Sequence, residues 1–265
     1  MKRDAVKGFS LLEVAIVMVI IGLIVGSVLA GQSMIRAAHM QTMLGEYDAN
    51  IKAVNEFKDK FLALPGDMNN AESMWGSDPA GCPGVASTAP HAATCNGDGS
   101  GTIGSSDFSG NLSNSAEWFR AWQQLSDAGM VPSAYAGTKG AGGAQESVPL
   151  QNVPGSGLPG AGWTLLYYSQ TTDSASLWGG SYGHVLMLGG FTAGAIARAP
   201  VLTASEASAI DQKIDDGNPG LGNIRAWRSA LLPGCTTDAG TQTSQAYVPT
   251  TGAGYACSLL FLMGM

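Results

Sequence analysis

The distribution of apolar residues sets the first part of this chain apart from the rest. No charged side chain occurs between Val14 and Ile35, and an apolar stretch of that length can cross a membrane as a helix. After Arg36 the apolar positions recur three and four residues apart, which is typical of an amphipathic helix. No proline interrupts residues 9–64. We therefore predict one long helix over 9–64, with its membrane-spanning part in 9–35.

Two shorter helices are predicted further along the chain. The periodicity predicts a helix over Ser115–Gly129, capped by its first residue, with Trp118 and Trp122 on one face. Core packing explains these tryptophans, and an exposed adhesive patch is the alternative. Thr203 and Glu206 have the spacing of a capping box, which predicts the start of a second helix.

Three stretches have the composition of β-strands. They cover residues 163–169, 184–191 and 255–263, and glycine-rich turns separate them. Residues 136–162 are rich in Gly and Pro, which indicates a linker or surface loop. We expect an α+β fold, in which the long helix packs against an antiparallel sheet within a globular head formed by residues 65–265.

Composition and charge narrow the classes of function. The net charge of −7 argues against nucleic acid as a partner, because phosphate binding needs a basic surface. His39, His91 and His184 do not fall beside an obvious nucleophile or carboxylate pair, and the usual phosphate-binding, serine-nucleophile and zinc-protease motifs are absent. We predict that the chain is not an enzyme; an enzyme on a membrane stalk is the alternative.

Charges at the N-terminus predict the orientation of the apolar segment. Lys2, Arg3 and Lys7 outweigh Asp4, so the positive-inside rule places the N-terminus in the cytoplasm and the head outside the membrane. A secretory signal peptide, cut within residues 27–31, is the alternative. The helical pattern continues without a break past this point, which favours a retained helix.

Residues 7–13, KGFSLLE, followed at once by the apolar segment, resemble the leader junction of type IV pilins and type II secretion pseudopilins. The resemblance implies cleavage between Gly8 and Phe9 by a prepilin peptidase, which also methylates the new amino terminus. Residues 1–8 would be the leader, and the apolar helix would stay on the mature protein. Implied partners are other pilin-like subunits and an inner-membrane assembly platform.

Glu13 is the acidic residue of this junction. An unpaired carboxylate in hydrocarbon costs several kcal/mol. The resemblance implies that, in a filament, the Glu13 carboxylate pairs with the amino terminus of Phe9 on a neighbouring subunit. A carboxylate that reaches the lipid headgroups from near the helix end is the alternative.

The four cysteines favour an exported head with disulfides. Cys82 with Cys95, and Cys235 with Cys257, enclose Gly- and Thr-containing loops, so we favour these two local pairings among the three that are possible. The competing interpretation of the first pair is a zinc site that also uses His91, although its spacing does not match short zinc motifs and no fourth ligand is evident.

Residues 96–107 resemble an EF-hand-type calcium loop. The predicted ligands are the side chains of Asn96, Asp98, Ser100 and Asp107 and the backbone carbonyl of Thr102. The loop departs from the motif at its first position, which is Asn, and at its last, which is Asp in place of Glu. Calcium and a plain glycine-rich turn are therefore both open interpretations.

Together with the apolar helix and the head, the resemblance implies a structural subunit of a type IV pilus-like filament, first held in the inner membrane and then assembled in the periplasm or on the cell surface. Two alternatives stay open: a periplasmic pseudopilin of a type II secretion system, and a monomeric membrane-tethered binding protein. Residues 209–226 are also similar to a segment of larger pilin-like proteins, and we interpret them as a structural turn.

Overall fold

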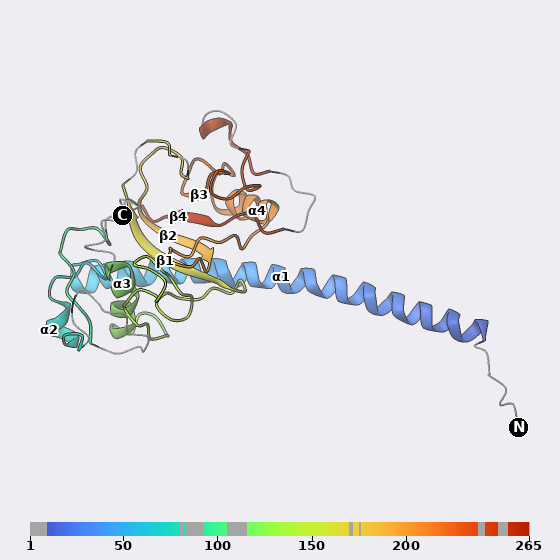
Figure 1. Ribbon diagram of the computed structural model, residues 1–265, viewed down its shortest axis with the longest axis horizontal. Helices are drawn as coiled ribbons and strands as arrows, with labels where there is room; N and C mark the ends of the chain where they lie inside the picture. The colour runs from blue at the N-terminus through green and yellow to red at the C-terminus, as the bar shows by residue number, and fades with distance from the viewer. Residues whose placement is uncertain are drawn as a thin grey trace, which may run out of the picture.

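The computed structural model describes residues 10–79, 82, 93–104, 116–169, 172–174, 176–237, 242–248 and 254–264. A head is gathered around the C-terminal half of one long helix, and the N-terminal half of that helix projects away from it (Figure 1). In chain order the elements are α1 (Leu11–Phe61), α2 (Ala71–Trp75), α3 (Ala116–Asp127), β1 (Ala161–Tyr168), β2 (Gly183–Gly190), α4 (Ala204–Ile214), β3 (Ile224–Ala226), the 3₁₀ turn η1 (Gln242–Ser244) and β4 (Leu259–Leu262).

Helix α1 confirms the predicted long helix and corrects its bounds. It begins at Leu11 because Ser10 has an extended backbone and its hydroxyl accepts a hydrogen bond from an N–H of the first turn. It ends at Phe61, short of the predicted residue 64, because Leu62 takes up a left-handed conformation with φ of 54°. The Leu62 N–H still donates to the Lys58 carbonyl at 2.9 Å, which closes the last turn.

The turn after α1 packs against α3 and is hydrogen-bonded to it. Gly66 has φ of 85°, and a Cβ atom at this position would lie 2.3 Å from the Glu117 carbonyl oxygen. The Gly66 N–H donates to Gln124 Oε1 at 2.7 Å, within the buried contact between the turn and α3. A larger residue at position 66 would therefore be both strained and crowded.

The sheet has the strand order β1-β2-β4-β3, with every pair antiparallel. The three predicted strands are present with shifted ends, and β4 is shorter than predicted. Cys257, which lies within the predicted strand 255–263, pairs with Leu202 in an isolated bridge outside β4. The predicted helix that starts after Thr203 is present as α4, and β3 lies further along the segment 209–226, where the sequence predicted a turn and no strand.

One hydrophobic core joins α1, α3 and the sheet. Tyr47 of α1 contacts Phe261 of β4 at a ring-centroid distance of 4.7 Å, and Trp163 of β1 completes this aromatic group. Trp118 and Trp122 of α3 are fully buried, so the core interpretation of these tryptophans is confirmed and the exposed patch is wrong. The predicted α+β architecture, a long helix packed on an antiparallel sheet, is thus present.

Residues 136–162 are packed against the head and do not form a free linker. The buried Asn152 side chain donates to the carbonyls of Thr138 and Glu146 at 3.0 and 2.9 Å. These hydrogen bonds connect separate parts of the same segment. Leu158 is also buried in the core, and the last two residues of the segment belong to β1. The Gly- and Pro-rich composition reflects tight turns here.

Candidate functional site

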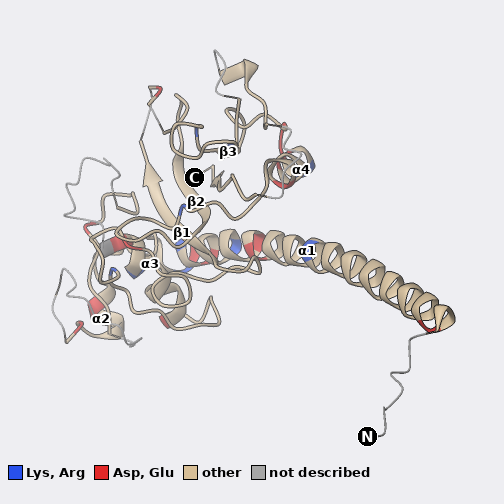
Figure 2. Ribbon diagram, turned by 45° about the vertical axis from the view of Figure 1, so that its right-hand side comes forward, with Lys and Arg blue, Asp and Glu red and all other residues tan. Residues whose placement is uncertain are grey.

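The N-terminal half of α1 is an apolar surface that the head does not cover. Every side chain from Leu11 to Ala30 is exposed, and most of them are apolar. Among the described residues, α1 is the one helix that is long and apolar enough to cross a membrane. In Figure 2 the ribbon segments coloured as charged residues of α1 lie in the half beside the head, except at the start of the helix, where Glu13 is in the first turn. This surface needs lipid or other protein to cover it.

Glu13 has a local role that the sequence reasoning missed. Its Oε2 atom accepts a hydrogen bond from the Ser10 N–H at 2.9 Å, while the Ser10 hydroxyl caps the first turn. The two residues form a capping box, in which each side chain satisfies a backbone N–H at the helix start. The Ser-x-x-Glu spacing could have predicted it.

The two predicted processing residues, Gly8 and Phe9, lie outside the described residues. The pairing between Glu13 and the amino terminus of Phe9 on another subunit stays a prediction. The carboxylate itself is in the exposed first turn of α1, four residues after Phe9 in the sequence. The predicted intermolecular pair would use the same carboxylate as the local capping bond.

Both predicted local disulfides are present in the head. Cys82 is bonded to Cys95, and Cys235 is bonded to Cys257, with Cα separations of 5.8 and 5.0 Å. The second bond ties the segment before β4 to the loop after β3, as the enclosed-loop argument predicted. The first uses both sulfurs of the alternative zinc site, and His91 of that site lies outside the described residues.

The predicted calcium ligands are only partly gathered. Asn96 Oδ1 accepts a hydrogen bond from the Glu72 N–H at 2.9 Å, so this side chain faces the start of α2. Ser100 and Thr102 approach each other, with their hydroxyl oxygens 3.0 Å apart. Asp107 lies outside the described residues. Calcium binding by this loop therefore stays a prediction.

One predicted ligand, Asp98, belongs to a cluster of three carboxylates at this loop. Carboxylate oxygens of Asp67, Asp98 and Glu117 all lie within 4.8 Å of one another, and Asp67 and Glu117 are buried. The three come from the turn after α1, the loop and α3, so sequence spacing alone could not bring them together. Asp67 accepts hydrogen bonds from the N–H groups of Ser100 and Gly101 at 2.8 and 2.9 Å.

The Glu117 carboxylate binds the same loop at positions before and after that segment. It accepts hydrogen bonds from the Asp98 N–H at 3.1 Å and from the Gly104 N–H at 2.6 Å. Burial nevertheless raises the pKa of Glu117 to about 7, helped by the charges of Asp98 and Asp67, and burial also raises the pKa of Asp67. The arrangement can hold a proton near neutral pH.

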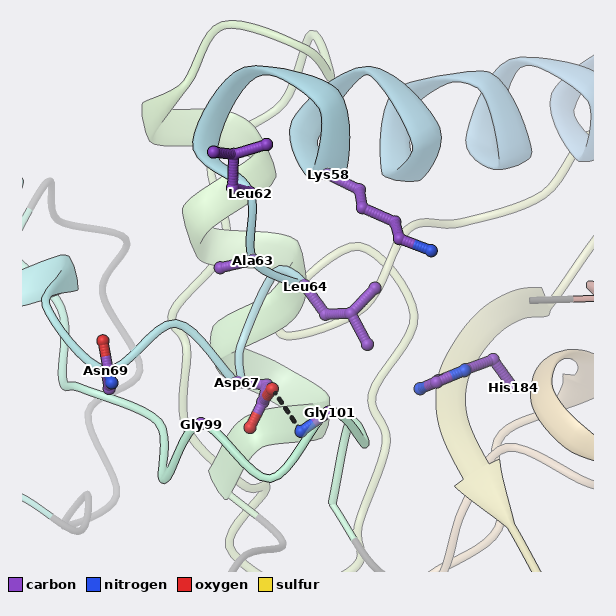
Figure 3. Close-up of a pocket in the computed structure, with 9 residues that line it drawn as sticks. All are labelled: Lys58, Leu62, Ala63, Leu64, Asp67, Asn69, Gly99, Gly101 and His184. Carbon is purple, nitrogen blue, oxygen red and sulfur yellow. Dashed lines mark hydrogen bonds between the residues drawn. The ribbon is translucent and has the colours of Figure 1, made fainter.

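A cavity of about 430 Å³ opens beside this loop, at the end of α1 far from the apolar half. Figure 3 shows Asp67, hydrogen-bonded to the Gly101 N–H, on one side of the cavity and the ring of His184 on the other. Lys58 reaches across the opening from α1. The His184 Nε2 atom accepts from the Ile103 N–H at 3.3 Å, so this histidine supports the loop.

We expect Glu117→Gln to flatten the pH dependence of stability between about pH 6 and 8. A raised folded-state pKa means that the native protein binds the proton more tightly, so this contribution is complete below the unfolded-state pKa and is lost as pH rises through about 7. The wild type should lose about 1–2 kcal/mol of unfolding free energy across this window. Urea denaturation of the full chain in EDTA, at several pH values, measures it.

The matched control is Asp211→Asn. Burial raises the Asp211 pKa to about 6, so this variant should change the slope mainly below the window assigned to Glu117. The comparison uses the slope with pH because Gln at position 117 cannot accept both backbone hydrogen bonds and lowers stability at every pH. An unchanged slope between pH 6 and 8 in Glu117→Gln would contradict the assignment.

Comparison with known proteins identifies one family signature. The model of the prokaryotic N-terminal methylation motif matches residues 3–29, a range that contains the predicted junction, Glu13 and much of the apolar half of α1. No curated protein and no solved structure matches the chain.

Proposed function

We propose that this chain, which carries the type IV pilin and pseudopilin signature, is a structural subunit of a type IV pilus-like filament. A prepilin peptidase would cut between Gly8 and Phe9, and the mature chain would assemble through its apolar helix. The signature supports assembly with other pilin-like subunits in general. The observation that carries the proposal is the motif joined directly to an uncovered apolar helix with a folded head.

The same apolar surface suits two successive environments. Within the inner membrane, lipid chains would cover α1 while the head stays in the periplasm. Within a filament, the apolar helices of neighbouring subunits would take the place of lipid. Helix α1 is long enough for both roles, since its apolar half extends beyond the head. A structural role of this kind needs no catalytic site, and we propose none.

Two other functions are compatible with the same N-terminal half. A periplasmic pseudopilin of a type II secretion system would be processed and assembled in the same way but would stay inside the envelope. A monomeric membrane-tethered binding protein would keep the apolar helix and would not need an assembly partner for Glu13. The two disulfide-bonded loops of a large head favour the surface filament as the first of the three.

The test is the mass of the N-terminal peptide in two cell fractions. Cells are sheared to release surface filaments, and the protein is purified from the sheared material and from membranes. We expect a chain that starts at N-methylated Phe9 in the sheared filaments. The same processed chain confined to the envelope would indicate a pseudopilin. A start at Met1, or a cut within residues 27–31, would contradict both.

A further inference from the structure

Arg36 makes a concentrated set of contacts where α1 meets the head. Its Nε and Nη2 atoms donate to the two carboxylate oxygens of Glu206 at 2.7 and 2.9 Å. Nη2 also donates to the Val201 carbonyl at 2.7 Å, and the guanidinium lies 4.8 Å from the ring centroid of Tyr255. The Arg36 and Glu206 side chains are only 21% and 17% exposed. A paired, half-buried arginine with three partners has one fixed geometry.

The partner carboxylate is held in place by its own helix. Glu206 is the third residue of α4 and accepts a hydrogen bond from the Thr203 N–H at 2.9 Å, as part of the α4 capping box. The same carboxylate therefore caps α4 and binds Arg36. Arg36 consequently joins α1 to the start of α4 at a defined point.

Arg36 lies on α1 before the part of the helix that is buried against the head. The residues of α1 that are buried against the head begin at Met43, about two turns further along the helix. Between α1 and the α4 side of the head lies an open cavity of about 390 Å³, which Arg36, His39, Glu206 and Tyr255 line. The Arg36 side chain spans this cavity and binds Glu206 on its far side. It therefore links α1 to α4 at a place where the two helices are not closely packed.

We propose that Arg36 is a positioning residue for assembly, which holds the α4 side of the head at a fixed place beside the apolar half of α1. The inference rests on the proposed function, because the position of the head beside the helix decides whether neighbouring subunits fit together. A lipid headgroup contact is the other use for a cation next to a membrane-spanning segment. The two uses predict different results for Glu206, which belongs to the head.

The first test measures assembly of the full chain in its native host with Arg36→Ala and with Glu206→Gln. Gln keeps the α4 capping box and removes the charge that binds Arg36. We expect each variant to reduce cross-linked multimers and sheared filaments at least about tenfold, because each leaves a half-buried group without its partner. The double variant should be no worse than either single one, since both remove the same contact.

Matched controls come from an exposed pair on the same helix. Lys52 and Glu56 lie 3.6 Å apart with side chains 75% and 53% exposed, so Lys52→Ala and Glu56→Gln should leave assembly unchanged. Arg36→Lys keeps the positive charge and loses the two-point contact, so it should also reduce assembly. A normal level of assembly in Glu206→Gln or Arg36→Lys would overturn the proposal and favour the headgroup contact.

The second test measures the position of the head directly. Spin labels are placed at Leu23 on the apolar half and at Ala209 on α4, both in exposed positions, and the distance distribution is measured in detergent. We expect a narrow distribution in the otherwise unchanged chain and a broad one in Arg36→Ala and Glu206→Gln. An unchanged distribution would overturn the inference. If the wild type itself forms no multimers, the proposed function fails. The distance measurement still shows whether the Arg36–Glu206 contact fixes the position of α4 beside α1.

Discussion

Glu13→Gln should abolish assembly while leaving the start of α1 intact. Gln can replace Glu in a capping box, so the bond to the Ser10 N–H and the helix start are kept. The variant removes only the charge that would pair with the new amino terminus of Phe9. In a low-dielectric filament core, removing one member of such a pair costs about 3–5 kcal/mol, because the other charge stays buried and unpaired.

The measurement is the amount of processed, multimeric protein in the sheared and membrane fractions of cells. Ser10→Ala is the matched control: it removes the hydroxyl half of the capping box and leaves the Glu13 charge in place. We expect Ser10→Ala to assemble and Glu13→Gln to be processed but not assembled. The opposite result, with assembly lost only in Ser10→Ala, would make Glu13 a helix cap and nothing more.

This pair of variants separates two roles of Glu13: a charge that pairs during assembly, and a cap of α1. Burial cost alone explains why a carboxylate in an apolar run needs a partner, and the family resemblance supplies the amino terminus as that partner. The structure adds a third group, the Ser10 N–H, which is already in place in a single chain. A local hydrogen bond therefore holds the Glu13 side chain at the helix start within a single chain.

The long helix could be predicted from sequence because its pattern is local. Apolar length and the lack of proline fix its existence, and Ser10-x-x-Glu13 also marks its start. Its end could not be predicted as well, because Leu62 takes a left-handed conformation that non-glycine residues rarely adopt. The predicted end at residue 64 followed from the lack of proline before Pro65, but the helix has already ended at Phe61.

The sites in the head depended on long-range contacts. The calcium motif placed its ligands within one loop, but Asn96 bonds to the start of α2, and Asp67 and Glu117 reach the loop from elsewhere in the chain. Strand β3 has three residues, too few for a periodic pattern, and exists because it pairs with β4. Such contacts appear only when the fold brings distant segments together.

Asp78→Ala should cause the largest loss of stability in the head. Asp78 Oδ2 lies 2.6 Å from Arg120 Nη2, and the two side chains are 0% and 2% exposed. The same guanidinium donates to Gln123 Oε1 at 2.8 Å, which keeps it in place on α3. Removing the carboxylate leaves a buried guanidinium without its counter-charge, and we expect a loss of about 3–5 kcal/mol in unfolding free energy.

The full chain in detergent, with both disulfides intact, is unfolded in urea and followed by tryptophan fluorescence. Lys52→Ala breaks an exposed ion pair and should lower the unfolding free energy by at most about 1 kcal/mol. It therefore gives the reference value for losing an ion pair at the surface. Asp78→Leu combined with Arg120→Met removes both charges and should recover much of the stability, since no buried charge is left unpaired. Equal losses in Asp78→Ala and Lys52→Ala would show that the pair does not hold α3 to the segment after α2. A double variant no more stable than Asp78→Ala would instead show that the cost arises from lost packing, because only an unpaired charge is relieved by removing its partner.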